Sequence, residues 1–162
     1  MSHNKQIQIE YSEFSSIDEL SPEDKKLLEF ARKNLNNAYA PYSEFKVSAA
    51  LLLENGEIIL GTNQENAAYP SGLCAERVAM FFASANFPKV PFTALAITAQ
   101  NISDTLKNPV FPCGGCRQVI LEYETLQQKP IRFILAGTEG SVIIIDGIKN
   151  LLPFSFDSSS LK

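Results

Sequence analysis

The chain has 162 residues, of which 45% are apolar and 20% charged, and its formal net charge is −4. This length fits one domain with a core large enough to fold without disulfide bonds. The acidic balance disfavours a nucleic-acid partner, because binding to that backbone depends on lysine and arginine side chains that neutralise phosphates.

Residues 1–20 are polar and weakly patterned, with a short strand expected at residues 7–11. They lack the apolar region of a signal peptide, and no stretch of the chain reaches the roughly 18 apolar residues of a membrane span. Three cysteines do not suit a secreted disulfide framework, whereas thiols persist as metal ligands in a reducing cytosol. We therefore expect a cytoplasmic protein with no membrane partner, an N-terminal extension over residues 1–20 and a single domain over residues 21–162.

The first half of this domain predicts one helix and a hairpin. Ser21 and Pro22 form a helix start signal, and residues 22–36 carry apolar side chains at helical spacing. Residues 45–53 form an apolar run typical of a strand buried on both faces. The pair Asn55-Gly56 then allows a tight turn into a strand over residues 57–62, so these two strands should be antiparallel.

The second half alternates helices with strands. Helices are expected to begin after Cys74 and at Pro112. Further strands are predicted over residues 92–98, 131–136 and 142–146. A helix between two strands implies a parallel crossover, but the short loop at residues 137–141 permits only an antiparallel neighbour. We predict an α/β fold, a three-layer α-β-α domain around a mixed five-stranded sheet whose last two strands are antiparallel.

The three cysteines are the most informative feature of the chain. Cys113 and Cys116 are three residues apart at a predicted helix start, which places them on one face, and Cys74 also lies at a helix start. Three thiolates leave one open position on a tetrahedral zinc ion, and an open position distinguishes a catalytic zinc from a structural one. The one histidine, His3, lies in a segment expected to fray, so we predict a zinc site built from sulfur alone.

Three charged residues next to these cysteines fit the same site. Glu76 lies two residues after Cys74, so a carboxylate is available to move protons. Three thiolates and a divalent cation leave a net charge of about −1, which Arg77, Arg117 and the positive helix ends would offset. Taken alone, Glu76 also fits a first-turn carboxylate favoured by the helix dipole.

The pair formed by Cys113 and Cys116 would by itself also fit a redox pair or half of a structural zinc site. A structural site requires four protein ligands, however, and the chain offers no fourth cysteine or ordered histidine. A redox pair would leave Cys74 and Glu76 unexplained. The motifs are therefore a strong signal only when they are taken together.

A first ligand, one residue, a glutamate and a later Pro-Cys-x-x-Cys form the pattern of zinc deaminases, with an all-cysteine variant allowed. This chain resembles the small homotetrameric cytidine deaminases over roughly residues 22–156. The resemblance is carried by four segments, at residues 40–47, 63–69, 74–77 and 112–119. It implies a hydrolase that acts on the C–N bond of a cyclic amidine and converts cytidine and deoxycytidine to uridine and deoxyuridine in pyrimidine salvage. It also implies one zinc ion per chain, bound by Cys74, Cys113 and Cys116, with Glu76 as the proton shuttle.

The resemblance also assigns the substrate contacts. Asn63 and Glu65 match the pair that grips the ribose hydroxyls, and an amide and a carboxylate can together donate to and accept from a diol. Phe45 matches the aromatic residue that packs against the pyrimidine ring, and the backbone of Ala75 matches the group that reads the base edge. Without the motifs, Phe45 would be interpreted as a core strand residue, and Asn63 and Glu65 as a polar loop.

Two further aromatic residues concern the assembly. Tyr69 and Phe156 match residues that reach toward a neighbouring subunit's site, so the resemblance implies a homotetramer. Both would otherwise be interpreted as ordinary interface or core aromatics. Phe154 and Ser155 replace a smaller pair that the family carries just before Phe156.

The sequence leaves three alternative functions open. A blasticidin-type aminopyrimidine deaminase would share the zinc and Glu76, but it would not need Asn63 and Glu65. Nucleotide and nucleic-acid deaminases typically use a histidine ligand, and the acidic charge of this chain opposes them. A non-catalytic, zinc-stabilised binding module would bind zinc and release no ammonia from any aminopyrimidine.

Overall fold

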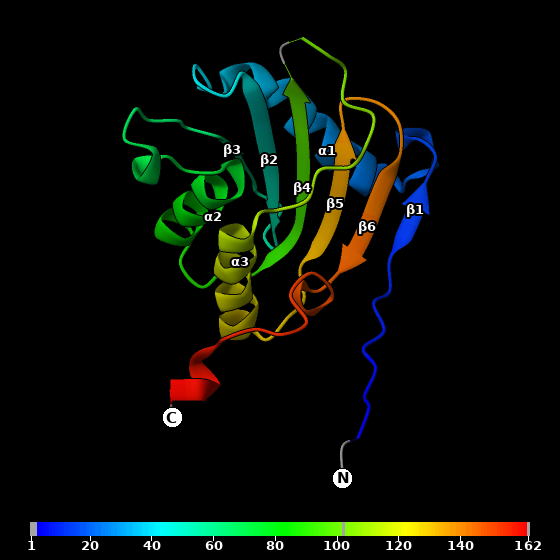
Figure 1. Cartoon of the computed structure of the whole chain (residues 1–162), viewed down its shortest axis with the longest axis vertical. Helices are drawn as coiled ribbons and strands as arrows, with labels where there is room; N and C mark the ends of the chain where they lie inside the picture. The colour runs from blue at the N-terminus through cyan, green and yellow to red at the C-terminus, as the bar shows by residue number, and fades with distance from the viewer. Residues whose placement is uncertain (1–2, 102, 162) are drawn as a thin grey trace.

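A six-stranded sheet forms the middle layer of the molecule (Figure 1). The computed structural model describes residues 3–101 and 103–161. The strands are β1 (Ser12–Phe14), β2 (Phe45–Leu53), β3 (Ile58–Thr62), β4 (Phe92–Asn101), β5 (Arg132–Gly137) and β6 (Val142–Asp146). Their order across the sheet is β1-β6-β5-β4-β2-β3. Strands β4 and β5 are parallel, and each other neighbouring pair is antiparallel.

The α/β class and the mixed sheet are confirmed, but the predicted count of five strands was one too few. The additional strand is β1, which pairs with the edge strand β6 through Ser12 and Ile144. We expected a short strand slightly earlier, at residues 7–11, which are exposed and outside the sheet. Three residues are too few to show a period of two, so the free edge of β6 determines where this strand forms. The antiparallel pairing of β5 and β6 is as predicted.

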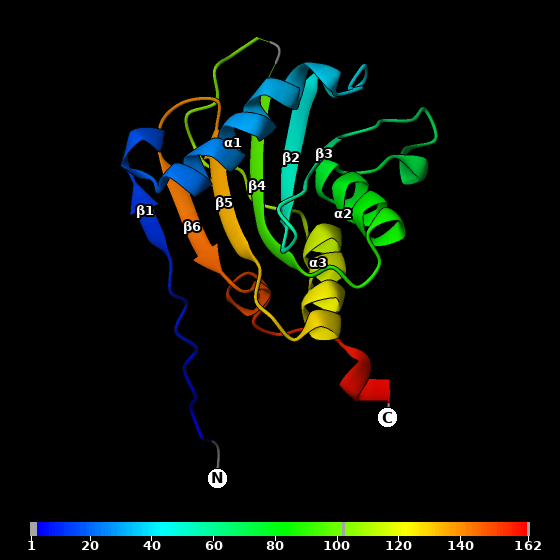
Figure 2. The same cartoon turned by 180° about the vertical axis from the view of Figure 1, so that it is seen from behind.

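Three helices cover the two faces of the sheet. They are α1 (Pro22–Asn34), α2 (Ala75–Asn86) and α3 (Gly114–Gln127). Helix α1 lies on the face seen in Figure 2, and α2 and α3 lie on the face seen in Figure 1, which gives the predicted three layers. At the start of α1, Ser21 Oγ accepts a hydrogen bond from the backbone N–H of Asp24 at 3.2 Å. The last residues of the predicted first helix form a separate 3₁₀ turn over Leu35–Asn37.

The sheet is buried on both faces, so the core has two parts. In β2, Ala49 and Leu51 pack with α2 and α3, whereas Ala50 packs with α1. Successive residues of a strand point to opposite faces, which explains why the apolar run at residues 45–53 has no polar alternation. Strand β2 also lies between β3 and β4, so the helix α2 crosses over a strand rather than linking direct neighbours.

Helix α2 packs unusually close to strand β3. A Cβ atom added at Gly61 would lie 2.3 Å from the carbonyl oxygen of Ala75 and 2.6 Å from the backbone nitrogen of Ala79. Only glycine permits this approach, because it has no Cβ atom. The contact determines the position of the first turn of α2, and therefore of Cys74 and Glu76.

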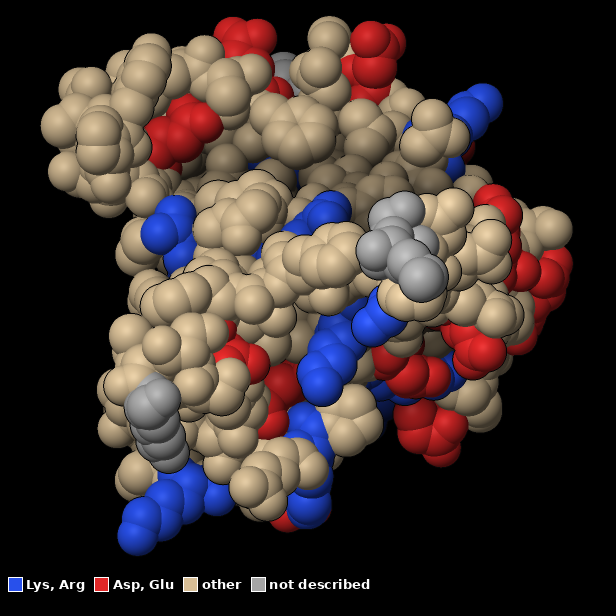
Figure 3. All heavy atoms as spheres, turned by 60° about the horizontal axis from the view of Figure 1, so that its bottom comes forward, with Lys and Arg blue, Asp and Glu red and all other residues tan. Residues whose placement is uncertain are grey.

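The N-terminal segment and the chain ends complete the description. Residues 1–2 of the expected extension and residue 162 lie outside the described residues, and the division into an extension and one domain remains a prediction. The face shown in Figure 3 carries acidic and basic side chains interspersed among uncharged ones. In the described part of the chain, no helix combines the length and apolar character that a membrane crossing requires.

Candidate active site

The three cysteine sulfurs meet where helices α2 and α3 begin. Cys74 is the N-cap of α2, Cys113 is the N-cap of α3, and Cys116 is in the first turn of α3. All three sulfur atoms lie within 4.8 Å of one another, and those of Cys74 and Cys113 are 3.8 Å apart. A disulfide would require about 2.05 Å, whereas zinc–sulfur bonds of about 2.3 Å in a tetrahedron place sulfurs about 3.8 Å apart. The cysteines therefore fit a shared metal ion, and soft thiolate ligands suit zinc.

The surroundings of these sulfurs favour negative charge. Hydrogen bonds from the Cys116 thiol, from Arg77 and from Cys113 lower the pKa of Cys74 to about 5. The same coupling to Cys74, together with burial, raises the pKa of Cys116. Arg77 Nη2 lies 3.9 Å from the Cys74 sulfur, and both helix N-termini point at the cluster. A divalent cation bound by the three sulfurs would stabilise the thiolate form of Cys116 against this effect.

Arg117 lies beside Cys116 but bonds elsewhere. Its Nε donates to the carbonyl oxygen of Pro112 at 2.8 Å, and its Nη1 donates to that of Leu151 at 2.7 Å. Neither of these two hydrogen bonds goes to a sulfur atom, although we expected Arg117 to offset the charge of the thiolates. Through these two bonds, the guanidinium group of Arg117 links the start of α3 to the segment after β6.

Glu76 is buried beside the cysteine cluster. It is the second residue of α2, only 4% exposed, and it faces the same cavity as Cys74 and Cys113. Burial is the main cause that raises its pKa above the ordinary value, and the charge of Cys74 adds to the effect. A carboxyl group with a raised pKa can both accept and donate a proton near neutral pH. Ala75, the first residue of α2, has a backbone N–H without an intrahelical partner.

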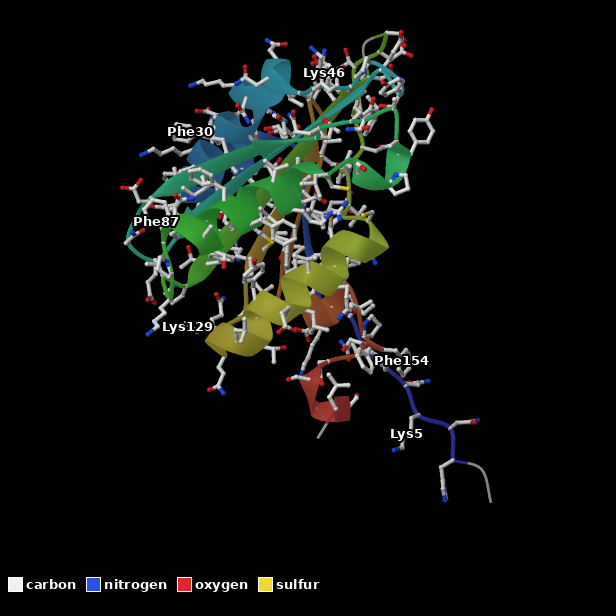
Figure 4. The ribbon with its side chains drawn as sticks, turned by 90° about the vertical axis from the view of Figure 1, so that its left-hand side faces the viewer. Lys5, Phe30, Lys46, Phe87, Lys129 and Phe154 are labelled. Atoms are coloured by element: carbon white, nitrogen blue, oxygen red, sulfur yellow. The ribbon has the colours of Figure 1, made fainter. Side chains whose placement is uncertain are left out.

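One cavity of about 650 Å³ connects the cysteines with the predicted substrate contacts. Of the residues predicted from the sequence, it is lined by Phe45, Asn63, Glu65, Tyr69, Cys74, Glu76, Arg77 and Cys113. Phe156 is not part of this wall: it is 60% exposed, and its carbonyl oxygen accepts a hydrogen bond from Gln118 Nε2 at 2.8 Å. Figure 4 shows the same separation, with the C-terminal segment at Phe154 on the far side of α3 from Lys46 in β2.

Asn63 and Glu65 are held firmly at the mouth of this cavity. The side chain of Asn63 accepts from the backbone N–H of Val47 at 2.8 Å and donates to the carbonyl oxygen of Phe45 at 2.9 Å. Glu65 Oε2 accepts from the backbone N–H groups of Tyr42 and Ser43 at 2.9 and 3.2 Å. The hydroxyl of Ser43 donates to Oε1. These bonds, chiefly that of the hydroxyl, lower the pKa of Glu65, which is therefore a carboxylate at neutral pH.

The cavity wall also contains residues to which we had assigned no role. Tyr42 and Ser43 precede Phe45, and Val110 and Phe111 precede the cysteines of α3. The rings of Tyr42 and Tyr69 meet edge to face with centroids 5.9 Å apart. Tyr42 and Ser43 lie within residues 40–47, the first of the four segments that carry the resemblance. This was the one sequence signal that could have identified them.

Comparison with known proteins agrees with this geometry. Residues 21–128, which include all three cysteines, match the family described as "Cytidine and deoxycytidylate deaminase zinc-binding region". A cytidine deaminase of Halalkalibacterium halodurans is 38% identical over 135 residues, which cover 83% of this chain and 95% of that protein. A crystal structure of the cytidine deaminase from Burkholderia pseudomallei superposes with a TM-score of 0.71 at 36% identity, covering 85% of this chain and all of that one. The chain belongs to the cytidine and deoxycytidylate deaminase family.

Proposed function

We propose that this chain is a zinc-dependent cytidine deaminase of pyrimidine salvage. It would convert cytidine and deoxycytidine to uridine and deoxyuridine with release of ammonia. The observation that carries this proposal is a cluster of three sulfurs at metal-binding separation beside one cavity, which Cys74, Cys113 and the buried carboxyl group of Glu76 line. The relatives described above, which are named cytidine deaminases, support the choice of substrate.

One zinc ion per chain would be held by Cys74, Cys113 and Cys116. Zinc supplies Lewis acidity at the position that three thiolates leave open, which makes water a stronger acid near neutral pH. Arg77 would offset the negative charge of the thiolates through its bond to Cys74. Arg117, in the first turn of α3, would offset this charge by its electrostatic field alone, without a hydrogen bond to a sulfur atom.

Glu76 would carry the protons of the reaction. Water adds its oxygen to C4 of the pyrimidine ring, and Glu76 accepts the proton that the water loses and transfers it to N3. Glu76 then accepts the remaining proton of the added hydroxyl and passes it to the exocyclic amino nitrogen. The bond between C4 and that nitrogen breaks, and ammonia leaves while the oxygen remains on C4 as a carbonyl. The burial of Glu76 suits this exchange, because it raises the pKa of the carboxyl group toward neutrality.

Phe45, Asn63, Glu65 and Ala75 would hold the nucleoside. The ring of Phe45 would pack against the base, and the N–H of Ala75 would bond to the base edge. Asn63 and Glu65 would bind the sugar hydroxyls with the donor and acceptor sites that their own hydrogen bonds leave free. Among the described residues that line the cavity, the only lysine or arginine is Arg77, beside Cys74. No other lysine or arginine of this described lining could pair with a 5′-phosphate, which favours nucleosides over deoxycytidylate.

Tyr69 and Phe156 would act across a subunit interface. Tyr69 is 74% exposed and lines the cavity, and Phe156 is exposed beside α3, where Gln118 donates to its carbonyl oxygen. We propose a homotetramer in which these rings are covered and reach a neighbouring subunit's site. The three unbridged cysteines favour a reducing compartment, so we propose a cytoplasmic location.

An absorbance assay of the purified protein against cytidine, deoxycytidine, dCMP and blasticidin S tests the proposal, with zinc content measured alongside. We expect turnover of both nucleosides, little of dCMP and blasticidin S, and about one zinc per chain. A preference for dCMP would refute the substrate, and a preference for blasticidin S would favour the deaminase that needs no ribose contacts. Bound zinc with no ammonia release from any compound would indicate a non-catalytic binding module.

A further inference from the structure

The turn at residues 40–44 leads into strand β2 and contributes to the cavity wall. The backbone N–H of Glu44 donates to the carbonyl oxygen of Ala40 at 3.2 Å, and Glu44 has a φ of 56°. This left-handed conformation is unfavourable for a residue with a Cβ atom. Such strain persists only where the surrounding contacts hold it, and it is concentrated at functional sites. Other contacts of this turn must therefore hold Glu44 in its strained conformation.

Ser43 makes the contacts that hold the turn. Its Oγ accepts a hydrogen bond from the backbone N–H of Phe45 at 3.1 Å and donates its own proton to Glu65 Oε1. Its backbone N–H donates to Glu65 Oε2 at 3.2 Å. An ordinary serine turn would need only the bond from Phe45. The additional bonds to a carboxylate 22 residues later link the start of β2 to the loop after β3.

These bonds determine which part of the carboxylate remains free. A carboxylate offers about four acceptor sites, and Oε2 already uses two of them for the N–H groups of Tyr42 and Ser43. Oε1 uses one for the Ser43 hydroxyl, so it retains one acceptor site. The carboxylate cannot rotate without losing bonds to charged oxygen, which are stronger than neutral ones. Glu65 is thus oriented before any ligand arrives.

The same strand end carries the other substrate contacts. Asn63 donates to the carbonyl oxygen of Phe45, so both backbone groups of Phe45 are tied to the polar pair that would hold the sugar. We propose that Ser43 is a positioning residue, whose hydroxyl joins Phe45 to Glu65 and sets the distance between the base contact and the sugar contact. This inference rests on the proposed function, since it concerns how the same cavity holds a nucleoside.

The predicted effect is selective for the sugar. Ser43→Ala would remove the bond that orients Glu65 Oε1 and keep the two backbone bonds at Oε2. It should therefore raise the KM for cytidine about tenfold and change kcat less than about threefold, as expected for one charged hydrogen bond. A ligand that lacks the 2′ and 3′ hydroxyls of the sugar would make no hydrogen bond to Glu65. Its affinity for Ser43→Ala should stay within about twofold of the wild-type value.

The experiment measures KM and kcat for cytidine together with the inhibition constant of 2′,3′-dideoxycytidine against cytidine turnover. The dideoxynucleoside lacks the 2′ and 3′ hydroxyls of the sugar, and as a competitive inhibitor it needs no turnover of its own. Ser43→Thr and Ser43→Val have nearly the same shape, but only the first retains a hydroxyl. Threonine should restore the KM to within about threefold, whereas valine should behave like alanine. Ser84→Ala, at an exposed position of α2, is the control for a serine change elsewhere.

The outcomes separate this inference from the proposed function. If the wild-type protein does not deaminate cytidine, the proposed function is wrong and this inference falls with it. If the wild type is active but the KM and the inhibition constant rise equally in Ser43→Ala, Ser43 has a general structural role and the inference alone is refuted. Equal kinetics for the threonine and valine variants would refute it as well, and melting temperatures identify any variant that has lost its fold.

Discussion

Replacing Gly61 with alanine should damage the active site although Gly61 does not line the cavity. The new Cβ atom would lie 2.3 Å from the carbonyl oxygen of Ala75 and 2.6 Å from the backbone nitrogen of Ala79, where ordinary contacts begin at 3.4 Å. Both neighbours are backbone atoms of α2, so no side chain can rotate away. The helix must therefore move by about 1 Å relative to β3, as the distance deficit requires.

This displacement has a cost in stability and a cost in activity. Overpacking of this kind costs about 1–3 kcal/mol, which for a chain of this length lowers the Tm by about 2–12 °C. The first turn of α2 carries Cys74 and Glu76, so the shift separates the proton carrier from the substrate. A misplacement of about 1 Å can reduce kcat/KM by as much as 10²-fold. We expect Gly61→Ala to lower kcat/KM for cytidine by about 10- to 100-fold.

The assay compares Gly61→Ala with Gly114→Ala by thermal unfolding, zinc content and cytidine turnover. Gly114 is the first residue of α3, next to Cys113, and a Cβ atom there would meet nothing within 4 Å. Alanine at Gly114 should leave the Tm within about 2 °C and kcat/KM within about threefold. Wild-type Tm and activity in Gly61→Ala would refute the reasoning. A lower Tm with full activity would show that the contact stabilises the fold but does not position Glu76.

Three further predictions concern protons, metal and pH. Glu76→Gln should retain about one zinc per chain and lose about 10²- to 10⁴-fold in kcat, because glutamine cannot carry the proton. The control is Glu23→Gln, since Glu23 is also the second residue of its helix, α1, but is exposed. Normal turnover in Glu76→Gln would show that another group moves the proton. Cys116→Ser should reduce the zinc content to below about 0.1 per chain and abolish turnover, since its fully buried sulfur is one of the three proposed ligands. Full zinc occupancy in this variant would contradict the proposed site. Burial raises the pKa of Glu124, although Ile131 and Ile148 donate backbone hydrogen bonds that oppose this effect. The folded state therefore binds a proton at Glu124 more tightly than the unfolded chain does, and it gains stability as the pH falls. From about pH 7.5 to about pH 5, the Tm of the wild type should therefore rise relative to that of Glu124→Gln, and an unchanged difference would exclude this contribution.

The metal site could be predicted from the sequence because its parts are local. The cysteines and Glu76 lie at or next to helix starts, and helix geometry determines where residues one to three positions apart point. The long apolar strand at β2 and the hairpin into β3 were equally clear, since their pattern and turn are contained within a few residues. Phe45, Asn63 and Glu65 were predicted as substrate contacts only through the resemblance that four motifs carry, and the structure brings them to one cavity.

Contacts between distant segments could be decided only by the tertiary structure. Strand β1 exists because the edge of β6 is free to pair, and Arg117 turns to carbonyl oxygens because the segment at Leu151 folds back onto α3. Gly61 and Ser43 are ordinary small residues in the sequence. One permits a helix to touch a strand, and the other joins a turn to a carboxylate 22 residues away. The sequence predicts which groups carry the proposed chemistry, because chemistry depends on residue type and local spacing. Only packing, which depends on every neighbour in space, decided how those groups are held.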